Sequence, residues 1–163
     1  MPSAFGVAPT LGDTARAMSQ ENVEVVRRMF AAFREGDWAA AFEPVDPNIE
    51  MDTTRTPIHG LDRVYKGREE VAGFWVEWLE AWGEQRIEDP ELIDARDRVV
   101  MWTTGHRIQG RGSGIEVSIP PYAWVMTLRD GRIVQATMYM EKDEALEAAG
   151  LSEKGAQRSD SLE

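Results

Sequence analysis

Apolar residues recur every three or four positions along two stretches of the chain, and this spacing predicts two amphipathic helices. The first stretch, SQENVEVVRRMFAAFREGD, starts at Ser19, a suitable N-cap, and reaches Gly36, a residue type common at helix ends. The second stretch is GREEVAGFWVEWLEAW, which places two glutamates in its first turn, where the helix dipole favours them. The apolar faces carry Val23, Val26, Met29, Phe30 and Phe33 in the first helix, and Val71, Phe74, Trp75, Trp78, Leu79 and Trp82 in the second.

Shorter helices, strands and turns are predicted around these two helices. Asp37 is placed to cap a short helix through WAAAFEP, and DEALEAAG predicts a short closing helix. The RDG sequence at 129–131 is a compact hairpin signal, whereas GRGSG at 110–114 is a looser turn. The predicted strands are 48–52, 85–95, 98–109, 115–128 and 132–141.

This element order indicates a single α+β domain. The order is α-α-β-α-β-β-β-β, so a curved antiparallel sheet is expected to pack against three N-terminal helices. We expect the domain to span residues 19–151, with a flexible leader at 1–18 and a flexible tail at 152–163.

The composition narrows the set of partners. A balance of 18 Lys and Arg against 29 Asp and Glu gives a formal net charge of −11, which argues against nucleic acid or an anionic membrane surface as a partner. The chain has no cysteine and only two histidines, without a ligand cluster, so no metal is expected. No apolar run approaches the roughly 20 residues of a membrane span. The N-terminus does not read as a secretion signal, so a cytoplasmic protein is expected.

The stretch NIEMDTTRTPIHG, at 48–60, carries the most suggestive carboxylates. Alternation along a strand puts Ile49 and Met51 on one face and Glu50 and Asp52 on the other. Either one of the two carboxylates works as an acid or base in a cavity, or both face water. In the second case, Asp52 would cap the turn that follows.

The segments FREGDWAAAF, VYKGREEVAGFW and LRDGRIVQATMYMEKDEALEAAGL, in this element order, resemble the NTF2-like superfamily. More narrowly, they are similar to its SnoaL-like and ketosteroid-isomerase-like branch, over about residues 19–151. The resemblance implies a cone fold, which hosts isomerases, polyketide cyclases, epoxide hydrolases, dehydratases and binding modules. In ketosteroid isomerases the strand after the second helix carries the aspartate general base, and Asp52 matches that position. The resemblance therefore implies that Asp52 points into the cone, with Glu50 at its rim.

The same likeness implies an incomplete isomerase site. The ketosteroid isomerase oxyanion hole combines a tyrosine with a protonated aspartic acid, and the corresponding positions here hold Met29 and Trp124. Loss of one oxyanion donor typically costs about 10²–10³ in rate. Steroid isomerisation by that mechanism is therefore not expected.

The resemblance also implies a cavity rich in aromatic residues and methionine. Arg107 would be its single inward positive group, with a surface salt bridge as the alternative. His106, at the opposite parity, would be exposed or at a subunit contact. His59 would lie on the loop over the cavity mouth, either as a second acid/base or as an ordinary loop histidine. The expected lining comprises Met29, Trp75, Met101, Thr103, Arg107, Tyr122, Trp124, Met126, Met138 and Met140.

Two functions are compatible with these features. The first is a cofactor-free enzyme that acts on a hydrophobic carbonyl or polycyclic compound. Its reaction would be an isomerisation, a cyclisation, a hydration or an elimination. In it, Asp52 would move the proton, and Trp124, Tyr122 and Arg107 would steady the negative charge. The second is a non-catalytic ligand-binding or accessory dimer. A protein-interaction module fits less well, because no peptide groove is indicated. A homodimer would form through the outer sheet face, where Tyr139 is expected.

Overall fold

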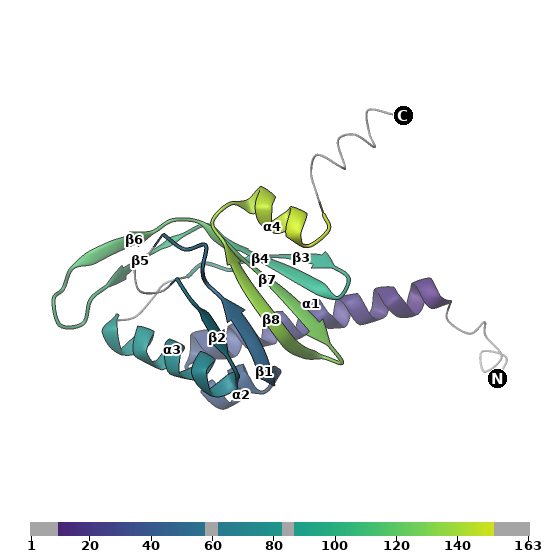
Figure 1. Cartoon of the computed structure of the whole chain (residues 1–163), viewed down its shortest axis with the longest axis horizontal. Coiled ribbons are helices and arrows are strands. Elements are labelled where there is room, and N and C mark those ends of the chain that lie inside the picture. The colour runs from purple at the N-terminus through teal and green to yellow at the C-terminus, as the bar shows by residue number, and fades with distance from the viewer. Residues whose placement is uncertain (1–9, 58–61, 83–86, 152–163) are drawn as a thin grey trace.

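The structure, a computed structural model, describes residues 10–57, 62–82 and 87–151 (Figure 1). The predicted α+β class is confirmed, and a curved sheet carries helices on its faces (Figure 1). In chain order the elements are α1 (Leu11–Glu35), α2 (Trp38–Phe42), β1 (Val45–Asp52), β2 (Val64–Lys66), α3 (Arg68–Ala81), β3 (Glu91–Ala95), β4 (Arg98–Thr103), β5 (His106–Gln109), β6 (Glu116–Ile119), β7 (Tyr122–Arg129), β8 (Arg132–Tyr139) and α4 (Lys142–Ala148).

Six strands form the main sheet, in the order β2-β1-β8-β7-β4-β3. Neighbouring strands are antiparallel except for β1 and β8, which run parallel. β5 and β6 form a separate two-stranded hairpin. In Figure 1 this hairpin extends beyond the ends of β4 and β7, over the region of α3.

The hairpin is separate because two of the predicted long strands are interrupted. Gly105, with a φ of 90°, stands between β4 and β5, and Pro120 and Pro121 stand between β6 and β7. A β-carbon at position 105 would lie 2.6 Å from the carbonyl oxygen of Ile119, so the site accommodates only glycine. Proline has no N–H to continue a ladder. The inside/outside alternation of side chains therefore starts afresh after the break.

Helices α1, α2 and α3 lie on one side of the sheet, and α4 lies on the other (Figure 1). The core between the sheet and α1 and α3 is the larger, and it includes Val26, Val99 and Ile133, which are at most 1% exposed. The smaller core forms where α4 covers the opposite face, around Val100 and Ala145. Within the described ranges, every helix is too short or too polar to traverse a lipid bilayer.

Several predicted helix ends and turns are confirmed. Gly36 ends α1 with a φ of 75°, and its amide donates to the carbonyl of Phe33 at 3.1 Å. The Asp37 carboxylate accepts from the amide of Ala40 and so caps α2. At the β7–β8 hairpin, Asp130 and Gly131 have φ values of 53° and 75°, as a tight two-residue turn requires.

The predicted start of the first helix is wrong. Helix α1 begins at Leu11, within the segment expected to be a flexible leader, and Ser19 lies inside the helix. Instead of capping the helix, the Ser19 hydroxyl donates to the Asp94 carboxylate on β3 at 2.9 Å. This contact between α1 and β3 gives Ser19 a tertiary role, which helical periodicity does not reveal.

The outer sheet face, next to α4, carries Tyr139 as predicted. The guanidinium of Arg55 lies 4.7 Å from the centroid of the Tyr139 ring. Tyr139 remains half-buried in the single chain. A homodimer through this face stays a prediction.

Candidate functional site

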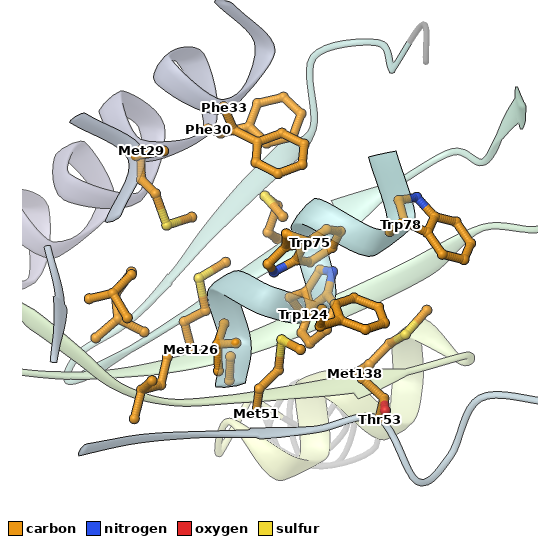
Figure 2. A pocket seen from close by; sticks show the side chains of 18 of the residues that line it. Met29, Phe30, Phe33, Met51, Thr53, Trp75, Trp78, Trp124, Met126 and Met138 are labelled. Carbon is orange, nitrogen blue, oxygen red and sulfur yellow. The ribbon is translucent and has the colours of Figure 1, made fainter. Parts of the chain in front are cut away.

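A cavity of about 160 Å³, partly open to solvent, lies between the sheet and the three helices on its inner side. Helix α1 contributes Met29, α3 contributes Trp75, and β7 contributes Trp124 and Met126 (Figure 2). Because these elements are far apart in sequence, only the folded chain forms the cavity.

Aromatic rings and methionine side chains form much of the cavity wall. The Trp75 ring centroid lies 5.2 Å from that of Phe33, 4.9 Å from that of Phe74 and 6.2 Å from that of Trp124. Edge-on and tilted contacts of this kind hold aromatic rings in defined positions. Methionine side chains are flexible and polarisable, so they can adapt to a guest. The methionines that line the cavity are Met29, Met51, Met101, Met126 and Met138.

Few polar groups face this cavity. No Asp, Glu, Lys or Arg occurs among the described residues that line it. Besides the indoles, the polar side chains are those of Thr53, Thr56, His106 and Tyr122. The Thr53 hydroxyl donates to the carbonyl of Arg63 at 2.9 Å, so it is engaged in joining β1 to β2. An uncharged ligand suits this environment, because a buried ion without a partner is costly.

His106 is the most unusual of these polar residues. Its Nδ1 is buried and has no hydrogen-bond partner. The imidazole meets the Tyr122 ring edge-on, with 5.9 Å between the ring centroids. Burial lowers the pKa of His106 below its ordinary value of 6.5, and burial raises the pKa of Tyr122 to about 12, despite a hydrogen bond with Thr103. Both side chains are therefore neutral near pH 7.

The pKa of His106 implies that stability depends on pH. Since the folded-state pKa is the lower one, the unfolded chain binds more protons as the pH falls below 6.5, and the free energy of unfolding decreases. We expect urea unfolding to show a loss of stability between about pH 7.5 and pH 5.5, and His106→Gln to lose less over this interval. Identical pH dependence in the two proteins would contradict the assignment.

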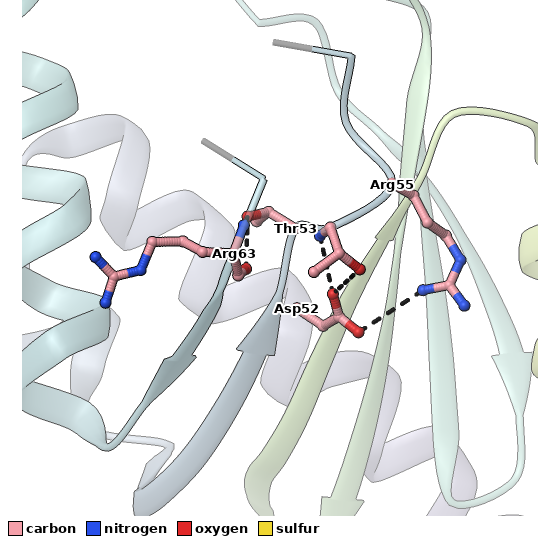
Figure 3. A network of polar contacts seen from close by, with 5 residues as sticks. Asp52, Thr53, Arg55 and Arg63 are labelled. Carbon is pink, nitrogen blue, oxygen red and sulfur yellow. Dashed lines mark hydrogen bonds and ion pairs between the residues drawn. The ribbon is translucent and has the colours of Figure 1, made fainter. Parts of the chain in front are cut away.

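The expectation that Asp52 points into the cavity is wrong. Ile49 and Met51 of β1 line the cavity, as does Thr53 just after the strand, whereas Asp52 is directed to the opposite face with 28% of its side chain exposed. Its carboxylate accepts from the amide and hydroxyl of Thr54, at 2.9 and 2.6 Å, and lies 3.7 Å from Arg55 (Figure 3).

Asp52 thus caps the turn that follows β1. Burial alone would raise the pKa of Asp52, but the hydrogen bonds from Thr54 and the charge of Arg55 outweigh burial and lower the pKa from 3.8. Its stabilising effect is lost only as the pH falls below 3.8, outside the range of the His106 effect. Glu50 is exposed on the same face as Asp52, away from the cavity.

The expected orientations of Arg107 and His106 are also wrong. Arg107 is exposed over 76% of its side chain and pairs with Glu116 of β6 at 3.0 Å, which is the surface salt bridge considered as the alternative. His106, expected outside, lines the cavity. The break at Gly105 exchanges the two faces, because the predicted strand continued the alternation of β4 without interruption.

Other expected lining residues divide into three groups. Met140 lies beyond the end of β8 and does not line the cavity, and the buried Thr103 donates to the carbonyl of Tyr122 instead. His59 lies outside the described residues. Trp78, which was expected in the core and not at the cavity, also lines it. Those found at the cavity as expected are Met29, Trp75, Met101, Tyr122, Trp124, Met126 and Met138.

Residues that the sequence indicated only as core also line the cavity. Phe30 and Phe33 belong to the apolar face of α1, and Phe74 belongs to that of α3. Helical periodicity identifies this face, but it does not distinguish a filled core from a cavity. Within the described ranges, no cluster of three or more His, Asp or Glu side chains could hold a metal ion.

Comparisons with known proteins agree with this architecture. A family model described as SnoaL-like domain matches residues 26–136, which include most of the cavity lining. No curated protein matches the chain at a significant level.

Solved structures show the same fold at low sequence identity. An NTF2-like protein of unknown function from Burkholderia pseudomallei is 22% identical, with 78% of this chain and 95% of that chain covered and a TM-score of 0.63. TerC, co-crystallized with polyporic acid, is 20% identical, with 80% and 98% covered and a TM-score of 0.62. A hypothetical protein with a ketosteroid isomerase-like fold from Catenulispora acidiphila, in complex with trimethylamine, is 17% identical, with 78% and 93% covered and a TM-score of 0.58.

Proposed function

Because the chain belongs to the SnoaL-like domain family, whose fold supports isomerase- or cyclase-type enzymes and ligand-binding proteins, we propose that it binds a compact, uncharged hydrophobic molecule in the cavity. The observation that carries this proposal is the apolar cavity without a charged side chain among its described lining residues. The co-crystallization of TerC with polyporic acid supports an organic ligand for this fold.

The size of the cavity restricts the ligand. Its volume of about 160 Å³ is close to that of an engineered apolar cavity of about 150 Å³ that binds benzene. A single ring fits this space, and a second ring requires the methionines to move or part of the ligand to remain at the opening. A one- or two-ring ketone or alcohol therefore suits the cavity better than the polycyclic compound considered from the sequence.

The chemistry of the lining favours binding over the acid/base route through Asp52. That carboxylate faces away from the cavity and bonds the turn at Thr54. A cofactor-free enzyme of isomerase or cyclase type remains the alternative function, and it requires a proton-transfer group within the cavity itself.

A binding titration tests the proposal directly. Trp75, Trp78 and Trp124 line the cavity, so a guest is expected to change the tryptophan fluorescence. We expect acetophenone to bind and benzoate to bind at least about tenfold more weakly, because the carboxylate would be buried without a partner. Equal binding of the two compounds would contradict a cavity that selects neutral ligands.

A substitution that fills the cavity tests whether the ligand binds there, and the same substitution at an exposed site serves as its control. Ala136 lines the cavity from β8, so Ala136→Leu is expected to weaken acetophenone binding by about tenfold or more through loss of space. Ala31→Leu makes the same substitution at an exposed site on α1 and should leave binding unchanged. If both variants bind as the wild type does, the ligand does not occupy this cavity.

A further inference from the structure

The Nδ1 atom of His106 is the single buried side-chain nitrogen or oxygen without a hydrogen-bond partner in the part of the chain that the structure describes. A polar atom left unpaired in a buried site costs free energy, and such an atom in a native protein calls for an explanation. His106 also lines the cavity, so a ligand there can contact its imidazole ring.

The surroundings of His106 keep the imidazole available for proton transfer. The edge-on contact with Tyr122 restrains the ring, and no carboxylate or cation from the described lining competes for its nitrogen. His106 and Tyr122 are the two titratable side chains among these lining residues. Because burial lowers the pKa of His106, the ring is unprotonated near pH 7, which is the form that accepts a proton.

We propose that His106 is the general base of this cavity and removes a proton from a carbon acid, such as the carbon next to the carbonyl of a small apolar ketone. The inference rests on the proposed function, because the ketone must first bind in the cavity. The proton passes from the α-carbon to the ring nitrogen, the C–H electron pair forms the C=C bond of an enolate, and the carbonyl π pair moves to oxygen. Return of the proton to the oxygen gives the enol, so the ketone tautomerises without a redox partner.

This base can be assayed without knowledge of the natural substrate. 5-Nitrobenzisoxazole is a compact, uncharged carbon acid that opens when a base removes the proton on its ring carbon. The C–H electron pair completes a C≡N triple bond, the N–O bond breaks, and the oxygen leaves as a coloured phenolate. The reaction needs no cofactor, and the partly open, methionine-lined cavity allows the nitro group to lie at the opening.

We expect the wild type to accelerate this elimination above the buffer rate, and His106→Gln to lose roughly 10²-fold of the acceleration, a typical general-base contribution. Glu116→Gln is the matched control, because it replaces an exposed carboxylate on the same hairpin by the same amide. That variant should retain the full rate. Ala136→Leu should lose the acceleration, because it fills the cavity.

These measurements distinguish failure of the general-base inference from failure of the proposed ligand binding. If His106→Gln reacts as fast as the wild type while acetophenone still binds, the inference is overturned and the proposed function survives. If acetophenone does not bind the wild type, both are overturned.

A second measurement applies even if His106→Gln fails to fold. In the wild type, the acceleration should decline as the pH falls through a value below 6.5, because His106 becomes protonated. A rate without such an inflection would overturn the inference.

Discussion

Replacing Gly105 with alanine is expected to lower the free energy of unfolding by about 2–4 kcal/mol, the sum of a left-handed backbone penalty and a steric clash. Gly105 has a φ of 90°, which side-chain-bearing residues rarely adopt. The added β-carbon would also lie 2.6 Å from the Ile119 carbonyl oxygen and 3.1 Å from the Pro120 carbonyl carbon. These are backbone atoms, so relief requires the hairpin itself to move.

The same substitution should weaken ligand binding. Gly105 immediately precedes His106, and its conformation directs the imidazole into the cavity. Gly112→Ala, in the turn of the same hairpin, is the matched control, because a β-carbon added at Gly112 would have no neighbouring atom within 4 Å. Urea unfolding and acetophenone titration measure both effects. If Gly105→Ala is as stable as Gly112→Ala, then Gly105 does not fix the orientation of the hairpin.

The elements that the sequence predicts well are those specified by local interactions. The apolar face of α1, the terminating Gly36 and the Asp130–Gly131 turn each depend on residues a few positions apart. Such patterns are readable because the periodicity and the turn chemistry point to the same structure. The α+β class followed from the order of these elements.

The orientation of β1 shows where the residue pattern was a better guide than the family position. Alternation alone grouped Ile49 with Met51 and placed Asp52 on the opposite face, as the structure does. The resemblance to ketosteroid isomerases turned Asp52 inward. A shift of one residue exchanges the two faces of a strand, and burial of apolar side chains determines which register forms. Catalysis by Asp52 therefore loses its geometric basis.

The role of His106 could not be derived from alternation, because the alternation is interrupted. Treating β4 and β5 as one strand placed Arg107 inside and His106 outside. The signals of the interruption are Gly105 and the Pro120–Pro121 pair, which lie far apart in sequence and meet in the folded hairpin. The cavity is similarly non-local, since its existence depends on how closely α1, α3 and the sheet approach one another.

The two faces of the sheet differ in polarity. The inner face surrounds the cavity with apolar side chains and holds His106. The outer face carries the Asp52–Arg55 contact, which is shown in Figure 3. The guanidinium of Arg55 also lies over the Tyr139 ring on this face. A proton-transfer group is more effective on the inner face, because the apolar lining leaves it less solvated than it would be on the outer face.

Ile133→Ala should lower the free energy of unfolding by about 2–5 kcal/mol, because it removes buried carbon atoms and leaves a larger void. Ile133 is 1% exposed and lines the cavity from β8. Its backbone amide donates to the carbonyl of Pro44, and that bond survives the substitution. The loss is therefore one of packing, and urea unfolding without ligand measures it.

The same variant should also accept a larger guest, because the removed atoms bordered the cavity. We expect the preference to move from acetophenone towards a two-ring ketone such as 2-acetonaphthone, and this ketone should restore part of the lost stability by binding only the folded state. Val134→Ala, at the neighbouring half-buried position outside the cavity lining, should leave the ligand preference unchanged. A large loss of stability with no change in preference would mean that the surrounding side chains collapse into the void, so that volume near Ile133 does not set the size of the ligand.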